Sequence, residues 1–177
     1  MRQKVERARL EEFLHALAAE ADDQVRIYLT GGASAVFLGW RSSTIDVDLR
    51  IEPQSDRILR AIPALKEQLS INVELASPGD FIPEPPGWET RSEFIMQDRM
   101  ASFYHFDFYA QALSKIERFH ERDILDVKEM LVRRLIDPQR LRELFDAIVP
   151  QLYRFPAVSP DAFRRNLDTI LSEEKTK

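Results

Sequence analysis

Two adjacent glycines that separate an apolar run from a run of alternating side chains constrain this chain more than any other feature. The chain has 177 residues but only 5 glycines, and Gly31-Gly32 follow directly after residues 24–30 (QVRIYLT), which are rich in β-branched and aromatic side chains. Residues 33–40 (ASAVFLGW) have the composition of a short helix, and residues 43–51 (STIDVDLRI) alternate polar and apolar side chains as a half-buried strand does. The pattern predicts a strand, a tight turn, a helix and a second strand in succession.

The remaining pattern places this unit in a small sheet that is followed by helices. We expect helices over residues 3–21 and 55–70, and a loop over residues 77–92, which carry four of the ten prolines. Together the segments predict an α+β fold (mixed α/β), with a small mixed β-sheet core in residues 1–110 and a helical region in residues 111–177 that packs on it. The other expected elements are strands over residues 71–77 and 102–109, and helices over residues 109–122, 123–136, 138–152 and 160–173.

Composition excludes several classes of protein. Hydrophobic residues make up 44% and charged residues 31% of the chain, and no apolar run approaches the roughly 20 residues of a membrane-spanning helix. The absence of cysteine excludes disulfides and thiolate metal sites, and the charged first residues do not look like a secretion signal. We therefore expect a cytoplasmic protein with no membrane partner. A net charge of −5 argues against broad, non-specific binding to nucleic acid but leaves room for a local basic groove.

The glycine pair and the serine after it are candidate ligands for an anion. A strand that ends in Gly31-Gly32 and runs straight into a helix exposes backbone N–H groups at the helix N-terminus, where negative charge is favoured. The missing Cβ atoms let a phosphate approach the backbone, and Ser34 adds a hydroxyl in the first turn. The alternative interpretation is a tight strand–helix turn that simply requires a positive φ.

Asp46 and Asp48 are candidate metal ligands. Residues two apart on a strand share a face, so these carboxylates lie side by side. Two like charges on a mostly apolar strand lower stability unless a cation sits between them, and carboxylate oxygens are the ligands that Mg²⁺ prefers. The alternatives are that both aspartates simply face solvent, or that they bind a structural cation.

These residues carry a resemblance to a known family. The pattern LTGGASAV…STIDVDL, with a spacer of 13 residues between Gly32 and Asp46, resembles the signature of the DNA polymerase beta-like nucleotidyltransferase superfamily. RSSTIDVD is similar to the form found in the bacterial branch that includes abortive-infection and toxin–antitoxin nucleotidyltransferases. The resemblance implies a small mixed sheet with the active site at one edge. It also implies that the glycine pair grips a triphosphate and that the paired aspartates bind Mg²⁺.

A third carboxylate helps to activate the attacking hydroxyl in two-metal nucleotidyl transfer, and the resemblance implies that a later strand supplies it. Glu74 is the preferred candidate for this role and for a third metal ligand beside Asp46 and Asp48, because it lies between Val73 and Leu75 on the strand that follows in sequence. Asp107 is the alternative on the same reasoning.

Residues 112–131 (ALSKIERFHERDILDVKEML) form a second informative segment. Lys115, Arg118 and Arg122 stand at i, i+3 and i+7, which places three cations on one side of a helix. The alternative is an ordinary charged surface in which Arg122 pairs with Asp126. The string is also similar to the second recurring segment of the same bacterial group. That resemblance implies that Lys115 contacts the nucleotide phosphates and that Arg118 and Asp123 belong to the nucleotide-binding site, where Asp residues orient the basic side chains. It also implies that Asp126 is structural.

The sequence therefore predicts an Mg²⁺-dependent enzyme that transfers a nucleoside monophosphate from an NTP to a hydroxyl, with a two-metal site and Mn²⁺ as an alternative ion. An RNA end, a protein or a small molecule are all candidate acceptors. The resemblance adds a toxin role and a cognate antitoxin as a partner. The other hypothesis is a catalytically inactive nucleotidyltransferase-like module that binds nucleotide or another protein.

Overall fold

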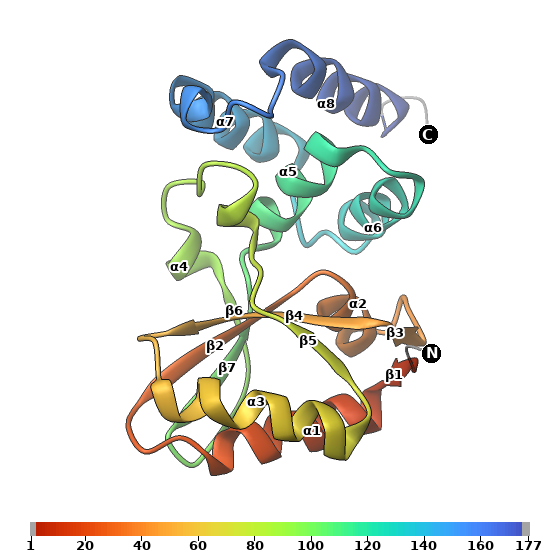
Figure 1. Cartoon of the computed structure of the whole chain (residues 1–177). Coiled ribbons are helices and arrows are strands. Elements are labelled where there is room, and N and C mark those ends of the chain that lie inside the picture. The colour runs from red at the N-terminus through yellow and green to blue at the C-terminus, as the bar shows by residue number, and fades with distance from the viewer. Residues whose placement is uncertain (1–2, 175–177) are drawn as a thin grey trace. The chain divides into compact units, whose positions relative to one another are not determined.

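The structure, a computed structural model, describes residues 3–174 and divides into two compact units (Figure 1). The first unit comprises Met1–Ser77 and Ser92–Phe106, and the second comprises Pro78–Arg91 and Asp107–Lys177. The proline-rich loop that was expected over residues 77–92 thus belongs, apart from its two end residues, with the helices of the second unit. The α+β class expected from the sequence is confirmed.

The first unit is built on a mixed sheet of five strands in the order β5-β4-β2-β7-β6. The central strand β2 pairs antiparallel with β4 and parallel with β7, while β4 pairs parallel with β5 at one edge and β6 pairs antiparallel with β7 at the other. Two short strands, β1 (Val5–Glu6) and β3 (Ser43–Thr44), pair separately. The strands of the main sheet are β2 (Val25–Thr30), β4 (Asp46–Glu52), β5 (Asn72–Glu74), β6 (Glu93–Asp98) and β7 (Ala101–His105).

The two faces of this sheet differ because β4 alternates strictly. Val47, Leu49 and Ile51 are buried, whereas Asp46 and Asp48 on the opposite face are half-buried. Helices α1 (Arg7–Ala19) and α3 (Asp56–Leu69) lie along one face, and their apolar side chains join the buried strand residues in one core (Figure 1). Each fully buried side chain of this kind contributes about 1.5–3 kcal/mol, so the core fixes which side of β4 its aspartates occupy.

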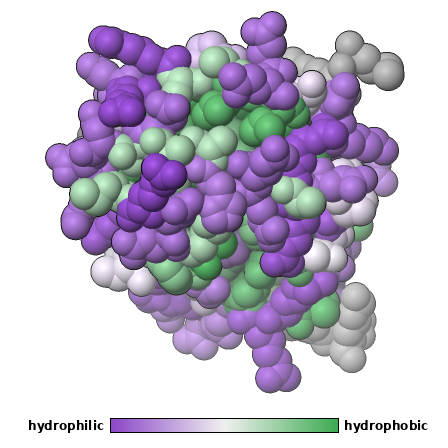
Figure 2. All heavy atoms as spheres, turned by 90° about the horizontal axis from the view of Figure 1, so that it is seen from below, coloured by the Kyte–Doolittle hydropathy of each residue, from purple (hydrophilic) through white to green (hydrophobic). Residues whose placement is uncertain are grey.

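Hydrophilic residues cover most of the surface on the side of α1 and α3, and hydrophobic ones show as patches between them (Figure 2). Among residues 3–174, no helix combines the length with the apolar composition that a membrane crossing requires.

The segment from β2 to β4 follows the sequence prediction closely. Helix α2 (Gly32–Leu38) begins directly after Gly31 and ends at Gly39, whose left-handed φ of 86° closes it. The expected helix over residues 55–70 is α3, which begins at the Ser55 cap, where the hydroxyl accepts a bond from the backbone N–H of Ile58 at 3.4 Å.

Strand β6 was not predicted, and strand β7 is shorter than predicted. Polar and apolar side chains do not alternate regularly over residues 93–98 (EFIMQD). The pairing of β6 with β7 shifts register between Phe94 and Met96, and β6 lies at the edge of the sheet. The expected strand over residues 102–109 ends at His105, since Asp107 caps the helix that starts at Phe108.

The second unit consists of helices, as expected, but with one boundary displaced. The break predicted at residues 122–123 falls at Phe119, which adopts a left-handed φ of 57° and ends α5. The rings of Phe145 and Phe163 pack edge to face with centroids 4.8 Å apart and tie the last two long helices together. The helices are α4 (Trp88–Arg91), α5 (Phe108–Arg118), α6 (Glu121–Val132), α7 (Pro138–Ile148) and α8 (Pro160–Glu174), with 3₁₀ turns at Pro78–Asp80 and Val149–Arg154.

Candidate active site

The candidate site lies where β4, β5 and the turn after β2 meet. Thr30, the last residue of β2, pairs with Asp48 on β4, so the chain leaves β2 directly beside the Asp48 carboxylate. Asp46 lies two residues earlier on the same face of β4, and both carboxylates are half-buried. The sequence prediction that the two aspartates share one face beside the glycine turn is confirmed.

Gly31 is held close to Asp48 by this register. Its backbone has φ 59° and ψ −129°, a conformation that side-chain-bearing residues rarely adopt. A Cβ atom on Gly31 would also stand 3.1 Å from Oδ2 of Asp48. The turn therefore requires glycine both for its conformation and for the approach of a carboxylate. Gly31 thus meets the requirement for a positive φ in a tight strand–helix turn, and it also lies beside a carboxylate of the candidate site.

Gly32 has a different role from Gly31. It is buried, and a Cβ atom there would collide with the hydroxyl of Thr44, which in turn donates a hydrogen bond to the Asp46 carbonyl at 2.9 Å. The missing side chain thus lets α2 pack against the chain that enters β4. The Arg41 guanidinium also lies near this turn, with Nη1 3.4 Å from the position of the same Cβ.

Ser34 does not have the expected role. It is 0% exposed, its hydroxyl donates to the Leu29 carbonyl at 3.2 Å, and its oxygen lies 2.9 Å from Nδ1 of His105. Burial lowers the pKa of His105 to about 4, so the imidazole is neutral at pH 7. Because the Ser34 hydroxyl hydrogen is directed to Leu29, we assign Nδ1 of His105 as the donor to the Ser34 oxygen. Ser34 therefore fastens α2 to the ends of β2 and β7 instead of offering a hydroxyl to a phosphate at the surface.

Glu74 is placed beside the aspartates by the parallel pairing of β4 and β5. Asp46 stands opposite Asn72 and Asp48 stands opposite Glu74, so all four polar side chains lie at one edge of the sheet. Asn72 donates through Nδ2 to Oδ1 of Asp46 at 2.7 Å and to Oε1 of Glu74 at 3.3 Å. Sequence reasoning did not identify Asn72. The signal was its position two residues before Glu74, which places it on the same face of the strand.

Asp107, the alternative third carboxylate, is not on a strand. It is the N-cap of α5, where its Oδ1 accepts from the backbone N–H of Tyr109 at 3.3 Å. Arg91 makes a two-pronged pair with it, from Nε at 3.2 Å and from Nη2 at 2.7 Å. The reasoning that treated Asp107 and Glu74 as equivalent strand residues is therefore wrong for Asp107, which holds α4 to the start of α5.

The basic residues of the second unit form a buried ion cluster. Lys115 Nζ lies 2.7 Å from Oδ2 of Asp126 and 3.3 Å from Oδ1 of Asp123, and its side chain is only 6% exposed. Arg118 binds the same Asp123 oxygen at 3.0 Å and is 39% exposed. Three of the predicted residues thus lie together. The expected stripe of Lys115, Arg118 and Arg122 on one helix is wrong, however, because α5 ends at Arg118 and Arg122 belongs to α6.

A family model described as "Nucleotidyltransferase of unknown function (DUF6036)" matches residues 8–159. The chain belongs to this family. The match covers both the β4–β5 edge and the Lys115 cluster, so both lie inside the family's shared region. No curated protein and no solved structure matches the chain.

Asp46 and Asp48 offer a metal ion two carboxylates and not a complete set of protein ligands. Among residues 3–174, no three His, Asp or Glu side chains are grouped so that they could hold a metal ion by themselves. Mg²⁺ is commonly bound through one or two carboxylates, with water and substrate phosphates at its other positions. Asp46 and Asp48, two half-buried carboxylates on one strand face, fit that donor set.

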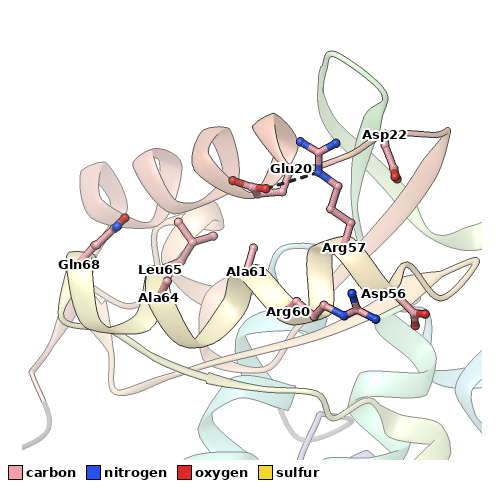
Figure 3. Close-up of a pocket in the computed structure, with 9 residues that line it drawn as sticks. All are labelled: Glu20, Asp22, Asp56, Arg57, Arg60, Ala61, Ala64, Leu65 and Gln68. Atoms are coloured by element: carbon pink, nitrogen blue, oxygen red, sulfur yellow. Dashed lines mark ion pairs between the residues drawn. The ribbon is translucent and has the colours of Figure 1, made fainter.

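A separate pocket of about 680 Å³ lies between α1 and α3 (Figure 3). Its wall carries charges of both signs, among them Glu20 and Arg57, which form an ion pair with Oε2 and Nε 3.7 Å apart (Figure 3). None of the predicted site residues lines it. Because its charges oppose one another, it shows no preference for a phosphate or a cation.

Proposed function

We propose that this chain is an Mg²⁺-dependent nucleotidyltransferase that moves a nucleoside monophosphate from an NTP to a hydroxyl acceptor. The observation that supports this function best is the set of carboxylates at the β4–β5 edge. Asp46 and Asp48 share one face of β4, and Glu74 stands opposite Asp48 on β5. Membership in a nucleotidyltransferase family supports the class of reaction.

In this reaction the oxygen of the acceptor hydroxyl attacks the α-phosphorus of the NTP. A new phosphorus–oxygen bond forms, the bond from the α-phosphorus to its bridging oxygen breaks, and pyrophosphate leaves with the electron pair. We assign the exposed Glu74 to accept the proton of the hydroxyl. Asp46, Asp48 and Glu74 would hold Mg²⁺, or Mn²⁺ in its place, as a two-metal site, and the bound ions would supply neutralisation of charge on the reacting phosphates.

We propose residues that bind nucleotide phosphates, with each unit considered by itself. In the first unit, the backbone of the Gly31-Gly32 turn is the candidate, with Gly31 partly exposed. In the second unit, Arg118 is the exposed member of the basic cluster and is held by Asp123, which Lys115 also binds. The assignment of a phosphate contact to the second unit rests on the resemblance of residues 112–131 to the bacterial nucleotidyltransferases.

The acceptor we propose is a hydroxyl on an RNA end, on a protein or on a small molecule. The resemblance to toxin–antitoxin nucleotidyltransferases favours RNA or protein, and with it a role as the toxin of a pair with a cognate antitoxin. With a net charge of −5, an RNA acceptor would meet a local basic surface and not a generally basic protein.

Transfer of label from α-³²P NTPs tests the proposal. The protein is incubated with each NTP and Mg²⁺, with bulk RNA and with bulk protein as acceptors, and released pyrophosphate is measured in parallel. We expect label in one acceptor, loss of transfer with EDTA, and loss of transfer in Asp46→Asn and Asp48→Asn. Asp22→Asn, which changes an aspartate of the pocket between α1 and α3, is the matched control. Full transfer by both site variants would refute the proposal.

One observation favours the second candidate, a nucleotide-binding module without catalysis. The described residues lack a group of three acidic side chains gathered around one metal position. Such a module would bind an NTP with Mg²⁺ but release no pyrophosphate with any acceptor. Binding by calorimetry together with the absence of turnover would support it over the enzyme.

A further inference from the structure

Asn72 lies at the centre of the proposed site, although it is neither acidic nor basic. It is half-buried on β5, the short edge strand of the sheet, and pairs with Asp46 across the parallel ladder. Its Nδ2 donates to Oδ1 of Asp46 on β4 and to Oε1 of Glu74 on its own strand, at 2.7 and 3.3 Å. One amide group therefore joins a carboxylate from each of the two strands.

We infer that Asn72 is a positioning residue that orients Asp46 and draws Glu74 toward it, so that both strands present their carboxylates together to a divalent cation. This inference rests on the proposed function. It adds a residue that carries no charge and that takes no part in the proposed proton transfer.

The chemistry of the amide explains why this residue type stands there. Carboxylates on neighbouring strands repel each other, and like charges at such positions destabilise a sheet. The NH₂ group of asparagine has two donors, so it can serve two carboxylates at once. A lysine could do the same, but its charge would oppose the approach of a cation. Asparagine holds Asp46 and Glu74 while leaving their negative charge for the metal.

The edge strand that carries Asn72 is itself held in place from the other side of the sheet. Lys66 of α3 donates through Nζ to the backbone carbonyl of Val73 at 3.3 Å. The buried side chain of Val73 points into the core, so its two neighbours point to the opposite face. Asn72 thus projects from a backbone that is fixed at its centre, as a side chain that orients other groups requires.

Titration with Mn²⁺, followed by electron paramagnetic resonance in the presence of a non-hydrolysable NTP, tests the inference without relying on turnover. Asn72→Leu has nearly the same size but no donor, and we expect it to lower Mn²⁺ affinity about 10- to 100-fold, the range typical for partners of metal ligands. Asn72→Ser keeps one hydroxyl hydrogen, which serves only one carboxylate, so we expect an intermediate loss. Urea unfolding of each variant without metal shows whether the fold is retained.

Asn166→Leu is the matched control, because this amide donates to the Ile116 carbonyl at 3.0 Å in the second unit. We expect it to bind Mn²⁺ as the unchanged protein does. If a folded Asn72→Leu protein binds Mn²⁺ with unchanged affinity, Asn72 has no positioning role. If the Asn72→Leu protein does not fold, unchanged affinity in the Asn72→Ser protein leads to the same conclusion. A protein that binds no Mn²⁺ overturns both proposals. Metal binding that depends on Asn72, without any nucleotide transfer, overturns the reaction but supports the positioning role.

Discussion

Replacement of Lys115 by methionine tests how the basic cluster of the second unit works. The Lys115 ammonium is buried between Asp126 at 2.7 Å and Asp123 at 3.3 Å. Methionine keeps much of the side-chain volume but removes the charge. The Asp126 side chain, only 3% exposed, then loses a counter-charge that water cannot replace. We therefore expect Lys115→Met to destabilise the second unit strongly.

The size of the effect follows from the burial of the pair. Removing one partner of a buried ion pair typically costs about 3–5 kcal/mol, because the other charge stays buried. Arg118 continues to pair with Asp123 at 3.0 Å, which places our expectation at the lower end, about 3 kcal/mol. For a chain of this length that loss corresponds to a decrease in Tm of roughly 6–12 °C.

Urea unfolding measures this loss in a Trp40→Phe background, because Trp40 lies in the first unit, so that the fluorescence of the buried Trp88 in α4 reports on the second unit. Lys128→Met is the matched control, since Lys128 pairs with Glu173 at 2.7 Å on the surface, and we expect a change of at most about 1 kcal/mol. Adding Asp123→Asn and Asp126→Asn to Lys115→Met should recover part of the loss. A Lys115→Met protein as stable as the control would refute the reasoning and would favour a lysine that is available to ligands.

Three further predictions concern the other parts of the site. Gly31→Ala should lower the free energy of unfolding by about 1–3 kcal/mol and weaken NTP binding, since the Cβ meets both an unfavourable backbone and Asp48 Oδ2 at 3.1 Å; unchanged urea and calorimetric titrations would contradict this. Because burial lowers the pKa of His105 to about 4, the unfolded state takes up a proton first, and stability should fall as pH drops from about 6.5 toward 4, by up to roughly 3 kcal/mol. The slope should flatten in His105→Phe, and an equal slope in both proteins would contradict the assignment. Glu74→Gln should slow transfer but leave melting unchanged, whereas Asp107→Asn should mainly lower Tm; the reverse result would make Asp107 the third carboxylate.

The parts of the fold that the sequence predicted are those with strong local signals. Strand β4 repeats its alternation over the whole of Asp46–Glu52, and a glycine pair marks the turn before α2. Both signals act over a few residues and do not depend on the rest of the chain. The placement of Asp46 and Asp48 on one face beside Gly31 could therefore be predicted from these residues alone.

The features that the sequence did not predict depend on contacts between distant residues. Ser34 occupies a plausible position for a ligand in the first turn of α2, but its orientation is set by His105, which is 71 residues away. Helix α5 ends at Phe119 in a left-handed conformation without glycine or proline, so the local sequence carries no clear stop signal. The resulting turn brings Asp123 and Asp126 of α6 back onto Lys115, a packing that the spacing along a single helix does not reveal.

Asp46 at the β4–β5 edge and Asp126 in the Lys115 cluster differ in the side chain that donates to each carboxylate. Asp126 receives an ammonium at 2.7 Å, which balances its charge and allows it to be buried at the junction of two helices. Asp46 receives a neutral amide at the same distance and remains half-buried at the edge of a sheet. The amide adds no positive charge of its own beside Asp46, whereas the ammonium places one directly against Asp126. A neutral donor of this kind can orient a carboxylate without itself opposing the approach of a cation.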